Sequence, residues 1–323
     1  MNRTLLAGAF LLLGTLWGSS FVAIDVGLEW FPPLTYAGLR YLLAGVVVLG
    51  YALFTTANWR PTSQRGWLVV GIAGTFLIGG HHALLYIGQL SVRPAVAAVI
   101  VSLIPVLTAL FGVSLLGKQM QAGDAVGFAL GFLGVFLVAQ PGVSDSAGTD
   151  ILARASALDP LALLAGDGLG VLTVFVAAAS FAIGAVLTEP FETGLPARTI
   201  QAWAMLIGAT ELLLAGILSG ESIAAIQWSQ TGLGALVYLG LIPGAVAFLL
   251  YFTLLGELGS AQINLISYLE PIMATVLSWF ILGELIDPLT GVGFVLVLAG
   301  FVWLQRASVS ALVFEHRTTT RSS

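Results

Sequence analysis

The chain has 323 residues, of which 58% are hydrophobic and only 8% are charged. A soluble globular protein is roughly a quarter charged, so this composition excludes a soluble body of this size, and its high hydrophobicity excludes intrinsic disorder. The net charge of −5 excludes a basic nucleic-acid surface, and the absence of cysteine excludes disulfides, thiol catalysis and thiolate metal sites. The composition therefore predicts a polytopic membrane protein that lies in a lipid bilayer.

Ten apolar segments are long enough to cross the hydrocarbon core, which takes about 20 helical residues. We place these spans at 5–25, 34–54, 67–88, 95–116, 123–140, 168–187, 199–219, 231–254, 261–282 and 289–305. The first is longer than the apolar core of a secretory signal peptide and lacks an A-x-A cleavage pattern, so we expect it to remain as a helix. The predicted fold is all-α, with ten transmembrane helices and no separate soluble domain.

Lysine and arginine in the loops predict the orientation, because cytoplasmic loops carry an excess of basic residues. With the amino terminus inside, only Arg93 and Arg154 fall on the external side. The cytoplasmic basic residues are then Arg3, Arg60, Arg65, Lys118, Arg198, Arg306, Arg317 and Arg321. This predicts a protein of the cytoplasmic (inner) membrane with both termini cytoplasmic. Residues 141–167 form the external linker and residues 306–323 form a cytoplasmic tail.

An internal repeat emerges when residues 95–138 are aligned without gaps on residues 261–304. Pro105 then meets Pro271, Gly127 meets Gly293, and Gly134 meets Gly300. Shared proline and glycine spacing is more informative than agreement between leucines and valines. We therefore expect two five-helix repeats, residues 1–140 and 168–305. Because five is odd, the second repeat enters the membrane upside down, as in many secondary transporters.

The two aligned prolines predict kinks near the middle of the bilayer. Each lies about ten residues into its span, roughly 15 Å deep. A proline inside a helix removes one backbone hydrogen bond, so Pro105 and Pro271 predict either static kinks for packing or hinges in a cavity wall.

Several short motifs resemble the drug/metabolite transporter superfamily, specifically its ten-helix EamA-type permeases. The matching stretches are Trp17-Gly18-Ser19-Ser20-Phe21, Arg40-Tyr41-Leu42-Leu43-Ala44, and Leu269-Glu270-Pro271 followed by Leu282-Gly283-Glu284. The first repeat departs from the family pattern at Lys118, where the resemblance implies an acid. The resemblance covers about residues 5–305 and implies a small-solute transporter, often an exporter of amino acids, metabolites or drugs, without indicating the substrate.

Three charged residues, Arg40, Glu211 and Glu270, fall well inside predicted spans. A charge at the bilayer centre costs about 2.5–3.5 kcal/mol, so it usually faces a cavity or a partner. Helix rise places Arg40 in one outer layer together with His81 and His82. Our hypothesis is that this layer lines a central cavity, where Arg40 offers a positive charge to an anionic group. The alternative is that Arg40 pairs with Glu270 or a backbone carbonyl and only holds helices together.

The histidine pair is open to more than one interpretation. His82, Tyr86 and Gln89 share one helix face, and His81 lies about 100° away. Adjacent histidines on a regular helix do not chelate one metal easily, and no third ligand is spaced nearby, so we expect neither a metal site nor a cofactor. Interhelical hydrogen bonding, substrate contact and a proton-linked role remain as alternatives.

The ninth predicted span carries a polar stripe, which faces protein or water rather than lipid. Its members are Asn264, Ser267, Tyr268, Pro271, Thr275 and Ser278. Glu270 lies beside this stripe and is the first candidate for a proton-carrying carboxylate, because burial makes protonation easier; Glu211 is the second. Trp17, Ser20, Tyr86, Tyr251 and Tyr268 are the candidate aromatic and hydroxyl lining of the cavity, with core packing as the alternative.

Two other functional classes were weighed against transport. An intramembrane enzyme would need a catalytic motif, but the chain has no H-E-x-x-H, no G-x-S-x-G and no Walker A sequence. A non-transporting membrane scaffold would not need polar groups at the midplane. The sequence therefore favours a secondary transporter for a small molecule. It leaves the oligomeric state open, with a homodimer as one alternative.

Overall fold

The computed structural model describes residues 3–120, 123–138, 167–263, 265–284, 288–304 and 306. Every element in this part of the chain is helical, and it contains no strand. The elements are α1 (Arg3–Leu28), α2 (Pro33–Thr55), α3 (Gln64–Ile72), η1 (Ala73–Gly80), α4 (His81–Gly88), α5 (Pro94–Val101), α6 (Ile104–Leu116), α7 (Asp124–Val138), α9 (Asp167–Thr188), α10 (Ala197–Leu218), η3 (Ile223–Ala225), α11 (Gln230–Leu241), η4 (Ile242–Val246), α12 (Ala247–Ile263), α13 (Ile266–Leu282) and α14 (Pro288–Leu304). Apart from Asp167 and Arg306, the expected linker and tail lie outside the described residues, as does Asn264.

The described helices confirm an all-helical membrane protein. Seven helices or continuous helix runs are long and apolar enough to cross a membrane, judged by length and composition. They are Thr4–Leu28, Pro33–Thr55, Gln64–Gly88, Pro94–Leu116, Gly168–Thr188, Ala197–Leu218 and Gln230–Leu258. The helices α7, α13 and α14 are also apolar but shorter. The count of ten spans stays a prediction.

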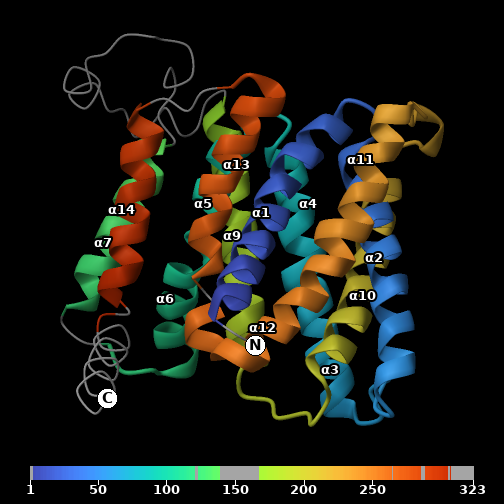
Figure 1. The fold of residues 1–323 in the computed structure, drawn as a ribbon, viewed down its shortest axis with the longest axis horizontal. Helices are drawn as coiled ribbons and strands as arrows, with labels where there is room; N and C mark the ends of the chain where they lie inside the picture. The colour runs from blue at the N-terminus through green and yellow to red at the C-terminus, as the bar shows by residue number, and fades with distance from the viewer. Residues whose placement is uncertain are drawn as a thin grey trace.

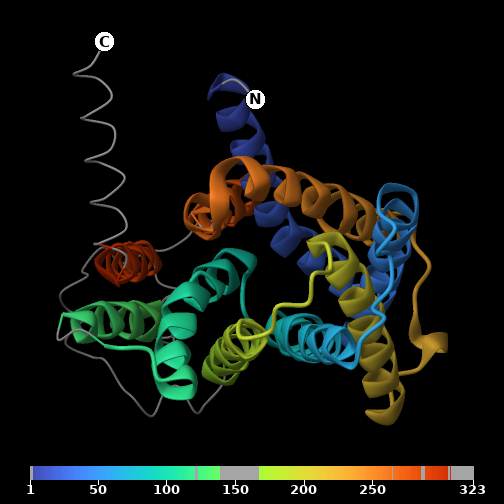
Figure 2. The same ribbon diagram turned by 90° about the horizontal axis from the view of Figure 1, so that it is seen from below.

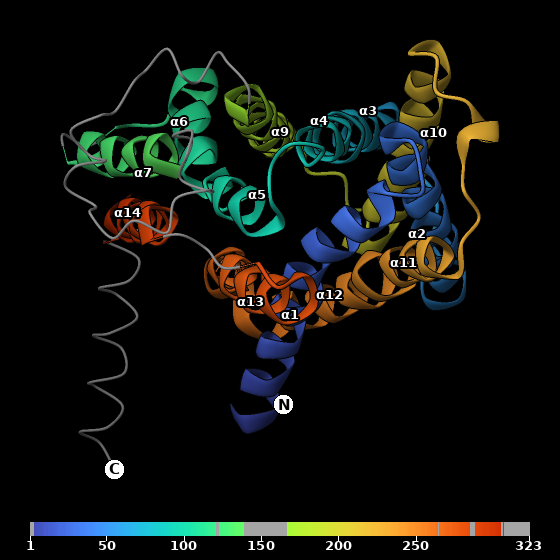
Figure 3. The same cartoon turned by 90° about the horizontal axis from the view of Figure 1, so that it is seen from above.

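The helices form one elongated bundle in which they run up and down (Figure 1). The views from below and above place α7 beside α14 at one end, with α2, α10 and α11 gathered at the other (Figures 2 and 3). Between these ends, α1 packs on α13 and α11, and α9 packs on α4 and α6. The helices of the two expected repeats, residues 1–140 and 168–305, are therefore interleaved rather than separated.

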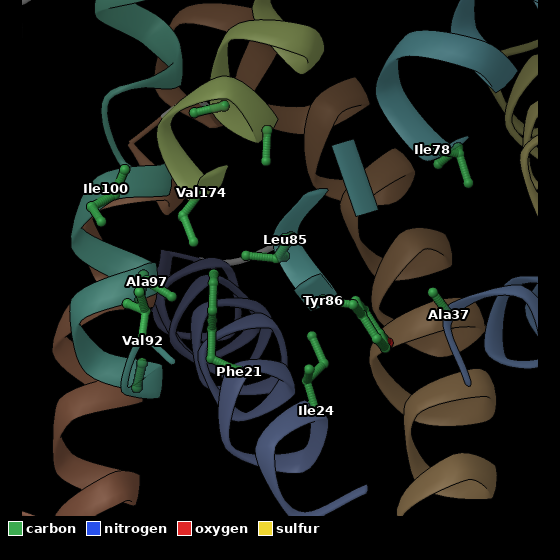
Figure 4. Close-up of a cluster of buried hydrophobic side chains, with 14 of the residues drawn as sticks. Phe21, Ile24, Ala37, Ile78, Leu85, Tyr86, Val92, Ala97, Ile100 and Val174 are labelled. Atoms are coloured by element: carbon green, nitrogen blue, oxygen red, sulfur yellow. The ribbon is translucent and has the colours of Figure 1, made fainter. Parts of the chain in front are cut away.

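The largest buried core runs through most of the bundle, and one part of it lies between α1, α4, α5 and α9. Figure 4 shows Phe21 and Ile24 of α1 next to Leu85 and Tyr86 of α4. Tyr86 is fully buried, and Val174 of α9 belongs to the same cluster. These residues lie towards the carboxyl ends of α1 and α4, so the core closes that end of the bundle.

Regular α-helical geometry breaks at three places inside the long spans. η1 and η4 are π-helical segments with the wider i→i+5 turn, which is rare and is often found at functional sites. The span Pro94–Leu116 is interrupted between Val101 and Ile104, and Pro105 lies in the first turn of α6 directly after that break. Pro271, in contrast, lies inside the continuous helix α13, so the two aligned prolines have different local geometry.

Glycine backbones make the contact between α7 and α14 close. A Cβ atom added to Gly134 would lie 2.5 Å from the Gly293 carbonyl oxygen, and one added to Gly300 would lie 2.5 Å from the Gly127 carbonyl oxygen. As residue numbers rise on α7, they fall on α14, so the two helices are antiparallel. Any side chain at these glycines would force the helices apart.

We predict that Gly134→Val destabilises the protein by about 1–3 kcal/mol, the usual cost of overpacking a tight contact. Thermal unfolding of purified protein in detergent measures the effect. Gly50→Val in α2 is the matched control, because a Cβ at Gly50 meets nothing within 4 Å. Equal melting temperatures for the two variants would contradict the close helix contact.

Candidate functional site

A cavity of about 660 Å³ lies within the helix bundle. Its volume falls in the range of small-molecule binding pockets, about 300–1,000 Å³. Residues from both expected repeats form its wall. Among the lining residues are Trp17, Ser20, Phe21, Arg40, Tyr41, His81, His82, Pro105, Thr108, Lys118, Phe128, Phe181, Gln201, Phe248, Tyr251, Ser267 and Glu270. The cavity is therefore a shared feature of the two halves.

Arg40 is buried in the cavity wall without a carboxylate partner. Its Nη1 atom donates a hydrogen bond of 3.1 Å to the Tyr86 hydroxyl, and its guanidinium carbon lies 4.8 Å from the centre of the Tyr41 ring. Its Nε atom is buried without a hydrogen-bond partner. Within the described residues no ion pair joins Arg40 to Glu270. The role of Arg40, as a charge offered to an anionic group or as a group that only holds helices together, therefore stays a prediction.

The two histidines extend the network around Arg40 across three helices. His81 Nδ1 lies 2.8 Å from the Ala177 carbonyl oxygen of α9, and His82 Nδ1 lies 3.1 Å from the Ile78 carbonyl oxygen. Because a carbonyl oxygen can only accept, Nδ1 carries the hydrogen in both rings. In the neutral His82 ring, Nε2 then accepts from the Tyr41 hydroxyl. Tyr41 thus links Arg40 to His82, and the His81 ring packs edge-on against the His82 ring, with ring centres 4.5 Å apart.

The two candidate proton carriers lie in different surroundings. Glu270 lines the cavity, and among the described residues its carboxylate has no hydrogen-bond or ion-pair partner. Glu211 is absent from the described lining and accepts a hydrogen bond of 2.6 Å from the Thr75 hydroxyl. Of these two carboxylates, Glu270 is therefore the one that lines the cavity.

An aromatic wall lies next to Glu270. The Trp17 ring centre lies 5.2 Å from that of Phe248 and 5.4 Å from that of Tyr251. α1 approaches α13 closely here, because a Cβ on Gly18 would lie 2.7 Å from the Glu270 carbonyl oxygen. The cavity therefore offers apolar ring faces beside a carboxylate, together with the hydroxyl-bearing Ser20 and Ser267.

Two tyrosines expected in the cavity lining lie behind its wall instead. Tyr86 is fully buried and serves as the acceptor for Arg40. Tyr268 is also buried and packs on Phe301, with ring centres 4.6 Å apart. Both expectations rested on helix-face periodicity, which does not show how a neighbouring helix covers that face.

The cavity lining also includes residues that were not among the sequence candidates, such as Tyr41, Phe181, Gln201 and Phe248. Tyr41 carried a usable signal, since it follows Arg40 directly and brings a hydroxyl into an apolar span. Gln201 is a polar residue near the start of α10 and carried a weaker one. Phe181 and Phe248 have no signal that separates them from ordinary packing aromatics. No group of three or more metal-ligating side chains occurs in the described residues.

A family model for EamA-like transporters matches residues 5–140 and 168–305. The chain belongs to the EamA-like transporter family. An uncharacterized inner membrane transporter of Escherichia coli, YedA, is 28% identical over 284 residues, covering 86% of this chain and 83% of its own. The uncharacterized transporter YvbV of Bacillus subtilis is 27% identical over 289 residues, covering 90% and 86%.

A solved crystal structure shares the fold of this EamA-like chain. It is 20% identical, has a TM-score of 0.63, and the match covers 96% of this chain and 99% of that one. At this identity the similarity shows the fold alone.

One end of the cavity carries the residue that departs from the EamA-type pattern. Lys118, which follows the end of α6, lines the cavity and pairs with Glu189 at 2.6 Å. Glu189 lies directly after α9, so the pair links the ends of two helices. Asp124 also lines this end and pairs with Arg306 at 2.9 Å. The cavity therefore reaches the end of the bundle where α6 stops and α7 and α10 begin.

We predict that Tyr86→Phe destabilises the protein by about 1–3 kcal/mol, because it leaves a buried guanidinium without its hydrogen-bond acceptor. Thermal unfolding of this variant is compared with that of Tyr51→Phe, whose ring is 41% exposed on α2. If both variants unfold at the same temperature, the hydrogen bond from Arg40 does not stabilise the wall.

Proposed function

We propose that this protein is a secondary transporter that exports a small solute across the cytoplasmic membrane by alternating access. The observation that carries the proposal is the cavity of about 660 Å³, into which the two sequence halves contribute Arg40 and Glu270. A solute of the size of an amino acid, a small metabolite or a drug fits this volume. The family and the names of the relatives support transport.

Contacts between the helices support two inverted five-helix repeats within a ten-helix bundle. The sequence alignment pairs Gly127 with Gly293 and Gly134 with Gly300. Under this pairing, the contact between Gly134 and Gly293 becomes the contact between Gly300 and Gly127, so the two α7–α14 contacts are equivalent. Ser63 and Ser229, which are 166 residues apart, each accept a hydrogen bond from the backbone N–H three residues on and so cap equivalent helices. An arrangement that maps onto itself when the halves are exchanged fits a two-fold axis in the membrane plane.

The π-helical segments supply a candidate hinge in each half. η1 and η4 follow the equivalent capped helices α3 and α11, and each accepts a hydrogen bond from the other half. The Ser180 hydroxyl donates to the Phe76 carbonyl at 2.9 Å, and Trp17 Nε1 donates to the Pro243 carbonyl at 3.3 Å. We infer that these crosswise bonds hold the two bent helices in this state and exchange when the cavity changes its side.

The basic residues favour an orientation with both termini in the cytoplasm. In that orientation, this structure corresponds to an inward-facing state. With this orientation the Lys118 end of the cavity faces the cytoplasm. The core around Phe21, Leu85 and Tyr86 then closes the external side. An exporter in this state can receive its solute from the cell.

We further propose that Glu270 carries the proton that couples export to the proton gradient. Its carboxylate faces the cavity without a partner, so solute and proton can compete for it directly. Glu211 bonds to Thr75 and does not line the cavity. It is therefore the matched control.

We predict that Glu270→Gln abolishes pH-gradient-dependent transport in proteoliposomes, whereas Glu211→Gln stays within about twofold of the unmodified protein. A thermal-shift screen of amino acids, sugars and cationic drugs first selects the solute, because binding to the folded state raises the melting temperature. Labelled solute flux is then measured with and without a pH gradient. The role of Glu270 would be contradicted if solute flux through the unmodified protein did not depend on the pH gradient. It would also be contradicted if both variants lost the gradient-dependent flux equally.

A further inference from the structure

A cluster of arginines and tryptophans lies at the end of the bundle where α2 ends and α3 and α10 begin. We call it the arginine–tryptophan patch, and its members are Arg60, Arg65, Arg198, Trp59, Trp67 and Trp203. None of the lining residues of the cavity belongs to it.

Direct contacts hold the patch together. The Trp203 ring centre lies 5.2 Å from that of Trp67 and 6.5 Å from that of Trp59. Trp203 Nε1 donates a hydrogen bond of 3.0 Å to the Trp59 carbonyl oxygen, and the Arg60 guanidinium lies 5.5 Å from the Trp59 ring centre. The three tryptophans thus pack together, and Trp59 holds the Arg60 guanidinium over its ring.

The three arginines lack acidic partners. Within the described residues none of them forms an ion pair, and segments 51–70 and 197–210 contain no aspartate or glutamate. Arg198 Nη2 donates to the Thr55 carbonyl oxygen, while its Nε atom is buried without a partner. Arg60 and Arg65 are exposed. Among the described residues, the three positive charges of the patch are therefore held without an ion-pair partner.

The start of α10 adds unsatisfied donors to the same place. The residue before this helix is Pro196, whose side chain provides no cap and whose carbonyl oxygen accepts from the Thr199 N–H, so the amides of Ala197 and Arg198 are the ones left for an external acceptor. The start of α3 lies alongside, because a Cβ on Gly66 would lie 3.2 Å from the Leu195 side chain. The arginine guanidinium can donate two parallel hydrogen bonds to two oxygens of one phosphate group, so these arginines suit a phosphate-bearing ligand.

We propose that the arginine–tryptophan patch binds the headgroup of an anionic phospholipid of the surrounding bilayer. Tryptophan rings prefer the depth of the lipid headgroups, and basic residues beside membrane helices attract anionic lipids. Trp67 is 43% exposed and offers its ring to the lipid. This site is independent of the transported solute, so it stands or falls separately from the proposed export.

The test measures melting temperature in neutral detergent with added phosphatidylglycerol or phosphatidylcholine. We expect phosphatidylglycerol to raise the melting temperature by roughly 3 °C more than phosphatidylcholine does. The variant with Arg60→Gln, Arg65→Gln and Arg198→Gln should lose this difference. Because each variant is compared with itself, a lower starting stability does not affect the result.

Two controls define the site and its ligand. Arg93→Gln removes one arginine at the other end of the span Gln64–Gly88 and should keep the full lipid effect. Inorganic phosphate at the same concentration should not reproduce it. If the triple variant cannot be purified, Arg60→Gln with Arg65→Gln tests the two exposed arginines alone.

The proposal is overturned if both lipids shift the unmodified protein equally or if the arginine variants keep the phosphatidylglycerol effect. A phosphate shift as large as the lipid shift would also overturn it, because the ligand would then be free phosphate.

Discussion

The hydrocarbon interior cannot solvate a charge, and the structure around Arg40 and Glu270 follows from that constraint. A charge at the bilayer centre costs about 2.5–3.5 kcal/mol, even with local relaxation. An ion pair between the two would lower that cost, but the described residues show none. Both groups instead line a cavity of about 660 Å³. We propose that the cavity leaves both groups available to a solute.

The same interior supplies no water to an unpaired backbone group, so irregular backbone must find partners within the protein. The Phe76 and Pro243 carbonyls of the π-helical segments receive side-chain donors from Ser180 and Trp17. Trp17 also forms part of the cavity wall. We propose that a solute packing against this ring acts on the hydrogen bond to the Pro243 carbonyl and in this way couples binding to helix movement.

Much of the fold could be predicted from the sequence, because the cost of exposing polar groups to lipid leaves long apolar spans with charges in the loops. The layer shared by Arg40, His81 and His82 was also readable, since helix rise is constant. It was harder to predict which side of each helix faces the cavity. Tyr86 follows His82 by four residues on the regular helix α4, yet it lies in the core because a neighbouring helix covers it there, and helix periodicity does not show such coverage.

Pairing between distant helices was beyond the sequence. Nothing near Lys118 indicates Glu189, and nothing near Glu211 indicates Thr75, because each pair joins helices whose proximity arises only from the folded bundle.

The most direct test of alternating access uses the absence of cysteine from the chain. In Thr108→Cys, the introduced thiol replaces a cavity-lining hydroxyl. Membrane-impermeant maleimide should label it from the cytoplasmic side in inverted vesicles, and from the external side in right-side-out vesicles once solute drives the cycle. Labelling from one side only, whatever the solute or gradient, would contradict alternating access.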